Sequence, residues 1–128
     1  MRLLLDTHAL IWWMNDDRQL SRPAFAAIAD PDNIVLVSAI SALELAIKNR
    51  LGKIPEAQYL ALNFEDEVEA AGFEQLPVVS SHARRGGAPA IPHRDPFDRI
   101  LIAQAQSEDA TLVSNEAIFD QFGVQRLW

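Results

Sequence analysis

The stretch Arg2-Leu3-Leu4-Leu5-Asp6 joins a short apolar run to an abrupt carboxylate. A run without polar alternation is typical of a strand that is buried on both faces, as in a parallel sheet. The apolar segment Thr7 to Met14 follows at once and is predicted to be a helix. A strand that leads directly into a helix favours an α/β fold.

The same alternation continues along the chain. Further strands are predicted over Ile34–Val37, Leu76–Val79, Thr111–Val113 and Val124–Trp128, and helices over Arg22–Ala29, Ser41–Leu51, Glu56–Ala71, Phe97–Ser107 and Glu116–Phe122. The helix from Ser41 is expected to bury a stripe of Leu43, Ile47 and Leu51. The glycines and prolines of Ala83–Pro92 predict a loop. We therefore expect a single domain over residues 1–128 with a central, mostly parallel sheet of about five strands flanked by helices.

Composition limits the functional classes. The chain has 128 residues, 49% of them hydrophobic, which is enough for one buried core. It has no cysteine, so disulfides and thiolate metal sites are excluded. No stretch approaches a membrane span, and Asp6 interrupts the first apolar run, so a cytoplasmic protein is expected. The net charge of −7 argues against a protein that coats nucleic acid, but not against an enzyme that acts on it.

Four oxygen-bearing side chains stand where strands end or the following helices begin: Asp6, Glu44, Asp98 and Asn115. The carboxyl ends of parallel strands meet at one edge of a sheet, so these side chains are expected to converge. A pocket with that much negative charge requires a cation. Hard oxygen ligands favour Mg²⁺, for which Mn²⁺ can substitute.

Each of these residues also has a structural interpretation. Asp6 can cap the helix that follows it, although Thr7 can do the same. Glu44 can belong to a capping box with Ser41 or form an ion pair with Lys48. Asp95 before a proline is expected to be a helix cap, which places Asp98 in the first turn. The joint pattern, rather than any single residue, indicates a site.

Other residue types carry weaker signals. The three histidines, His8, His82 and His93, are expected to face solvent or lie in loops, and none has helical ligand spacing. Trp12 and Trp13 are interpreted as core or contact residues rather than as a platform for bases. The chain shows no glycine-rich phosphate loop and no Ser-His-Asp order. Asp6 also lacks the second aspartate of a phosphatase nucleophile, which argues against an aspartyl-phosphate mechanism.

At this point the chain resembles a PIN-domain ribonuclease of the VapC toxin family, one half of a type II toxin–antitoxin pair. The resemblance rests on Leu3-Leu4-Leu5-Asp6-Thr7-His8, Ser38-Ala39-Ile40-Ser41-Ala42-Leu43-Glu44-Leu45, His93-Arg94-Asp95-Pro96-Phe97-Asp98-Arg99-Ile100-Leu101-Ile102-Ala103-Gln104-Ala105, Leu112-Val113-Ser114-Asn115-Glu116 and the tail from Phe119 to Trp128. These stretches occur in the expected order and cover the whole chain.

The resemblance implies that Asp6, Glu44 and Asp98 are the catalytic acids and hold Mg²⁺. The family often has a fourth acid where this chain has Asn115, which can still donate an oxygen ligand. Glu116 or Asp120 is the alternative for the fourth position, and the sequence does not choose between them. The resemblance also implies an RNA substrate, a VapB-type antitoxin and a homodimer.

Further expectations concern substrate binding and the alternatives to catalysis. Arg84, Arg85 and Arg94 are predicted to bind the RNA backbone. A catalytically decayed PIN-fold protein-binding module is the main alternative, in which the acids are only caps. A phosphatase is a third possibility, but it would need a lysine at a strand end near the nucleophile.

Overall fold

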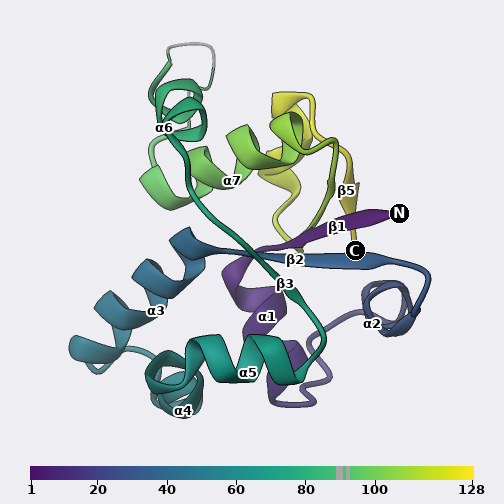
Figure 1. Cartoon of the computed structure of the whole chain (residues 1–128), viewed down its shortest axis with the longest axis vertical. Helices are drawn as coiled ribbons and strands as arrows, with labels where there is room; N and C mark the ends of the chain where they lie inside the picture. The colour runs from purple at the N-terminus through teal and green to yellow at the C-terminus, as the bar shows by residue number, and fades with distance from the viewer. Residues whose placement is uncertain (89–90, 92) are drawn as a thin grey trace.

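A five-stranded parallel sheet forms the centre of the protein (Figure 1). The computed structural model describes residues 1–88, 91 and 93–128. The strands are β1 Arg2–Leu5, β2 Ile34–Ser38, β3 Glu74–Leu76, β4 Thr111–Val113 and β5 Arg126–Leu127, in the order β3-β2-β1-β4-β5. Every neighbouring pair is parallel, which confirms the predicted α/β class.

The central strand β1 explains why its sequence is apolar without interruption. Leu3 and Leu5 point into one hydrophobic cluster and Leu4 points into another, on the opposite face of the sheet. All three are fully buried. Since successive side chains of a strand alternate between faces, a strand covered on both sides needs an apolar residue at every position.

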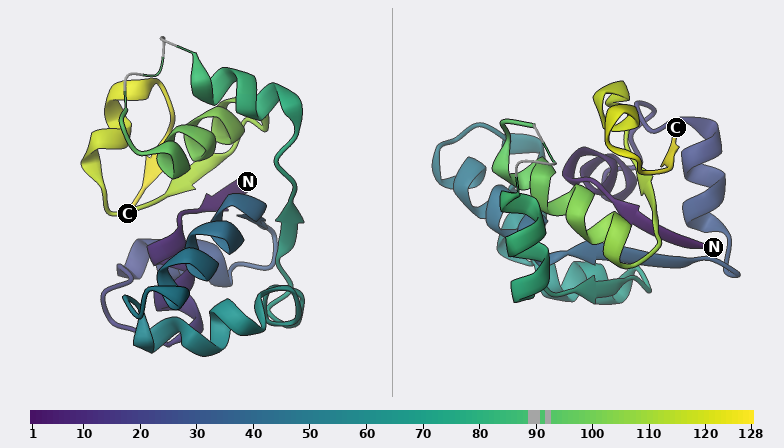
Figure 2. Two further views of the ribbon diagram at one scale, coloured as in Figure 1. Left: turned by 90° about the vertical axis from the view of Figure 1, so that its left-hand side faces the viewer. Right: turned by 90° about the horizontal axis from the view of Figure 1, so that it is seen from above.

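Helices cover both faces (Figures 1 and 2). Their bounds are α1 Thr7–Met14, α2 Arg22–Ala29, α3 Ala39–Arg50, the 3₁₀ turn η1 Pro55–Ala57, α4 Gln58–Leu62, α5 Phe64–Ala70, α6 Ser80–Gly87, α7 Pro96–Ser107 and the 3₁₀ segment η2 Ala117–Phe122. Helices α1, α2, α4 and α5 contribute to the cluster that contains Leu3. Helix α7 and η2 contribute to the cluster that contains Leu4, and α6 packs on α7.

Helix α3 begins two residues earlier than the sequence predicts. Ser38 is its cap, with Oγ accepting a hydrogen bond from the Ile40 N–H at 3.0 Å. The buried side of α3 carries Ser41, Glu44 and Leu45, so the predicted apolar stripe is wrong. Leu43 and Leu51 are each 51% exposed.

The predicted helix over Glu56–Ala71 is interrupted at Asn63. The Asn63 Nδ2 donates to the carbonyl of Tyr59 at 2.9 Å. An asparagine side chain that bonds to nearby backbone competes with the helical hydrogen-bond pattern. The segment therefore forms η1, α4 and α5 as separate pieces.

Two further differences concern β3 and the predicted loop. Strand β3 ends at Leu76 because Pro77 has no N–H to extend the ladder. The segment Ala83 to Gly87 is helical, not a loop, since Gly86 serves close packing: a Cβ there would lie 3.0 Å from Ile100 Cδ1. Of the predicted loop, Pro89, Ala90 and Pro92 lie outside the described residues.

The C-terminal elements are shorter than predicted. The expected helix from Glu116 is a 3₁₀ segment that begins at Ala117, and the expected strand over Val124–Trp128 is reduced to β5. Within the described residues, no helix is both long and apolar enough to cross a membrane.

Candidate active site

Asp6 lies at the carboxyl edge of the sheet, between the ends of β1 and β4. Its N–H donates to the Val113 carbonyl at 3.1 Å, and its Oδ1 accepts from the Ala9 N–H at 2.8 Å. Asp6 itself is therefore the cap of α1, which is one of the alternatives that the sequence left open. Burial raises the pKa of Asp6 to about 6, against the opposing effect of a hydrogen bond from Ser114.

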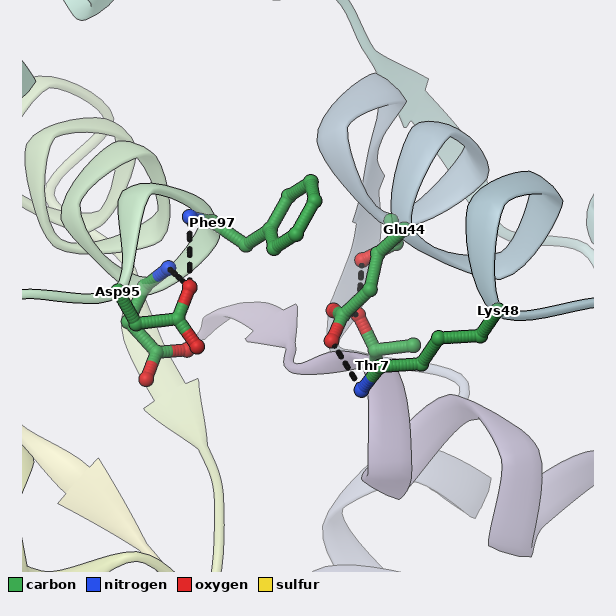
Figure 3. A network of polar contacts seen from close by, with 7 residues as sticks. Thr7, Glu44, Lys48, Asp95 and Phe97 are labelled. Atoms are coloured by element: carbon green, nitrogen blue, oxygen red, sulfur yellow. Dashed lines mark hydrogen bonds and ion pairs between the residues drawn. The ribbon is translucent and has the colours of Figure 1, made fainter. Parts of the chain in front are cut away.

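Glu44 is held at both carboxylate oxygens (Figure 3). The Thr7 hydroxyl donates to Oε1 at 2.6 Å, and Lys48 Nζ lies 2.7 Å from Oε2. The capping-box interpretation is wrong because Ser38 is the cap, and the Ser41 hydroxyl contacts the Thr7 hydroxyl at 3.0 Å instead. The Lys48 ion pair is present as one of the alternatives predicted. Helix α3 thus presents a carboxylate that is fixed at both oxygens at the edge of the sheet.

Asp98 comes from the first turn of α7. The Asp95 side chain caps this helix by accepting from the N–H groups of Phe97 at 2.9 Å and Asp98 at 3.4 Å, which confirms the predicted cap (Figure 3). The pKa of Asp98 is raised to about 7, first by burial and then by the charges of four other acids: Asp95, Glu116, Glu44 and Asp6. Acids from four parts of the chain therefore act on one carboxyl group.

His93 belongs to this region, contrary to the sequence prediction. Its Nε2 lies 3.1 Å from Asp98 Oδ2, within ion-pair distance although without hydrogen-bond geometry. Its Nδ1 accepts from the Asp95 N–H at 3.2 Å, so the neutral ring carries its hydrogen on Nε2, toward Asp98. His82 is also misassigned by the sequence: it lies buried in α6, where Nδ1 accepts from the Val79 N–H.

Among the candidates for the fourth acidic position, Glu116 is the one whose charge acts on the other acids. The charge of Glu116 raises the pKa of both Asp6 and Asp98. Asp120 is instead paired with Arg126, at 2.8 Å and 3.1 Å. Asn115 is exposed and borders a hollow beside the acids.

Buried hydroxyls around the acids were missed by the sequence reasoning. Ser114 bonds the Asp6 carboxylate and accepts from the Glu116 N–H at 3.0 Å. Thr7 plays the equivalent part for Glu44. Thr7 directly follows Asp6, and Ser114 directly precedes Asn115. These positions beside candidate site residues were the signal that the sequence offered.

The predicted RNA-binding arginines are all exposed side chains. Arg84 and Arg85 are exposed on α6, and Arg94 is exposed before α7. Arg99 has a structural role, because its guanidinium donates to the carbonyls of Gly86, of Ala88 at 2.8 Å and of His93 at 3.0 Å. It thereby ties the end of α6 to the start of α7.

The donor set suits a hard cation, although it is not assembled around one point. Repulsion among the acids shows an excess of negative charge that a divalent ion would relieve. Within residues 1–88, 91 and 93–128, no three acidic or histidine side chains already form an ion-binding group. Glu44 is paired with Lys48, and Asp98 is in contact with His93.

A parallel α/β sheet with acids at its carboxyl edge defines a class of open α/β domains that bind their ligands at that edge. Comparison with protein families narrows this class: the PIN domain model matches residues 3–125, and the chain belongs to that family. A stretch of 72 residues is 37% identical to ribonuclease VapC16 of Mycobacterium tuberculosis. That match covers 54% of this chain and 51% of the relative, so it spans about half the relative's length.

Solved structures share the fold at low sequence identity. VapBC2 of Rickettsia felis, bound to a DNA fragment from its promoter, gives a TM-score of 0.70 at 14% identity over 99% of this chain and 98% of that one. A toxin–antitoxin complex from Klebsiella pneumoniae gives 0.65 at 19% identity over 98% and 96%. The PIN domain endonuclease Utp24 gives 0.58 at 13% identity over 98% and 83%.

Proposed function

We propose that this PIN-domain chain is a metal-dependent endoribonuclease that acts in the cytoplasm as the toxin of a VapBC-type pair. The observation that carries the proposal is the set of acids after β1, in α3 and after β4, whose charges raise the pKa of Asp98 in α7. The match to a ribonuclease over half its length and the fold of toxin–antitoxin complexes support it.

Asp6, Glu44 and Asp98 would hold Mg²⁺ or Mn²⁺, with Glu116 rather than Asn115 as the fourth acid. When bound, the cation would polarise the scissile phosphodiester and lower the pKa of the attacking water. Thr7 holds Glu44 Oε1, and Lys48 binds Oε2. If the attacking water replaced Lys48 at Oε2, Glu44 could accept its proton, so Glu44 is our candidate proton acceptor.

RNA binding would use the exposed basic side chains near α6 and the start of α7. Arg84, Arg85 and Arg94 are the candidate contacts to the phosphate backbone. Because such contacts act mainly on binding, neutralising them should raise KM and leave kcat nearly unchanged. An unchanged KM in the triple glutamine variant would remove these residues from the substrate site.

The partners proposed for the chain are a VapB-type antitoxin and a second copy. Exposed apolar side chains on α3, on α4 and at the end of α3 support a protein contact there: Leu43, Leu51, Tyr59 and Leu62 are 51%, 51%, 69% and 67% exposed. Molar mass from light scattering would test the homodimer. A Leu62→Glu variant that remains a dimer would assign this surface elsewhere.

The decisive experiment is cleavage of total RNA by the purified, antitoxin-free protein with Mg²⁺, with Mn²⁺ and with EDTA. The matched control is Asp98→Asn, which keeps the size of the side chain. Cleavage that requires metal and is lost in the variant supports the proposal. A folded protein that neither cleaves RNA nor binds Mn²⁺ would favour the decayed binding module.

A further inference from the structure

A hollow of about 320 Å³ opens beside the acids, and Glu116 is the one lining residue that the proposed chemistry uses. It is lined by His8 and Trp12 of α1, by Gln19 before α2, and by Asn115 and Glu116 after β4. Its size is at the lower end for a small-molecule site. Two segments that flank Asp6 therefore also shape this hollow.

The aromatic side of the hollow is formed by His8 and Trp12, which lie one helical turn apart. Their ring centroids are 5.6 Å apart, and the Trp12 ring also packs against Trp128 at 5.6 Å. Trp12 is half-buried, so neighbouring side chains fix its ring, whereas His8 is exposed. Because the His8 and Trp12 ring planes are tilted by 40°, a flat heterocycle would stack on the face of one ring and contact the other at an angle.

The remaining walls are polar and carry both donors and acceptors. Gln19 and Asn115 are exposed amides, and Gln19 Nε2 is oriented by Asp17 Oδ2 at 3.3 Å. Amide side chains can donate and accept at once, as the edge of a nucleobase requires. An aliphatic protein segment would leave these polar groups without partners.

The hollow lies close to the acidic site. Glu116 lines it and also acts electrostatically on Asp6 and Asp98. His8 stands in the first turn of α1, which Asp6 caps, and its charge also acts on Asp6. A group bound in the hollow would therefore adjoin the reacting phosphate.

We infer that this hollow is a base-binding subsite, in which one nucleobase next to the scissile phosphate stacks on His8 and Trp12 and is read by Gln19 and Asn115. The inference rests on the proposed ribonuclease function and adds a source of sequence preference to it. It also gives Asn115 a role in reading a base instead of binding metal.

The test measures binding of short homopolymeric RNAs of A, C, G or U to Asp98→Asn protein in EDTA, so that nothing is cleaved. One well-stacked and hydrogen-bonded base is expected to give about a tenfold preference for the best homopolymer over the worst. His8→Ala and Gln19→Ala should each reduce this preference severalfold. Gln58→Ala, the same substitution as at Gln19 but on exposed α4, should leave it unchanged.

Several outcomes would overturn the subsite while leaving the nuclease intact. These are cleavage by the wild type with no base preference, and a preference that survives both variants. Variants that keep the preference but lose association with a second copy or an antitoxin would identify a protein contact instead. Base-selective binding without any cleavage by the wild type would support the subsite and reject the nuclease.

Asn115→Ala separates the two roles of that residue. In the base-reading role, the variant changes the homopolymer preference and binds Mn²⁺ as tightly as the wild type. Weakened Mn²⁺ binding with an unchanged preference would return Asn115 to the metal site.

Discussion

Asp98→Asn should stabilise the metal-free protein near neutral pH while it abolishes cleavage. Burial and neighbouring acids raise the pKa of Asp98 from 3.8 to about 7, which corresponds to about 4 kcal/mol at about 1.4 kcal/mol per pKa unit. Water reaches this carboxyl group, and screening reduces the effect to about 2 kcal/mol. The variant also loses the favourable interaction of the Asp98 charge with the dipole of α7, which lowers the gain in the free energy of unfolding by about 0.5 kcal/mol. A net gain of about 1–2 kcal/mol remains, or about 3–8 °C in Tm.

The pH dependence distinguishes this explanation from a general effect of the substitution. Because the folded protein binds the Asp98 proton more tightly, the wild type loses stability as pH rises from about 4 to about 7. The asparagine variant lacks this loss, so the difference in Tm should be near zero at low pH and reach its full value above about pH 7. Thermal unfolding in EDTA across this range is the assay. Equal Tm values throughout, or a difference independent of pH, would refute the reasoning.

Three other predictions concern neighbouring groups. Thr7→Val should lower cleavage about 10-fold or more by releasing Glu44, whereas Thr7→Ser should retain activity, as initial rates would show. The free energy of unfolding of Asp6→Ala should be about 1 kcal/mol lower than that of Asp6→Asn, because asparagine can still cap α1. Urea unfolding of the two inactive variants at acid pH makes the comparison, and equal midpoints would contradict the prediction. Arg99→Lys should cost about 2 kcal/mol, since one ammonium cannot replace the guanidinium at three carbonyls, and an unchanged Tm would exclude that role.

The sequence predicted the parallel sheet because buried strands leave a local signature. The continuous apolar runs at Leu3–Leu5 and Val35–Val37 are required by burial on both faces. The helix cap at Asp95 was predicted for a similar reason, since a cap depends on adjacent residues. By contrast, Gly86 looked like a loop residue because its function is contact with α7, which only the folded chain reveals.

The candidate site, like the fold, has some features that the sequence predicts and others that only the folded chain reveals. That Asp6 and Glu44 lie near enough to Asp98 for their charges to act on it could be inferred from the strand ends, because topology alone brings those ends together. The position of His93 beside Asp98 could not be inferred, since it depends on how the segment before α7 folds back. The effect of Glu116 on Asp98 likewise depends on the path of the chain after β4. The sequence alone does not show whether Asn115 or its neighbour Glu116 faces the acids.

The central place of β1 has a consequence for the synthesis of the protein. Leu3 pairs with Val35 on one side and with Thr111 on the other, so the first strand made must wait for one of the last. At a translation rate of about 5–20 residues per second, one edge of β1 stays bare for about 5–20 s. The acids at positions 6, 44, 98 and 116 cannot meet before then. A nascent chain therefore has no assembled acidic site, and any RNA-cutting activity starts only after almost the whole chain has been released from the ribosome.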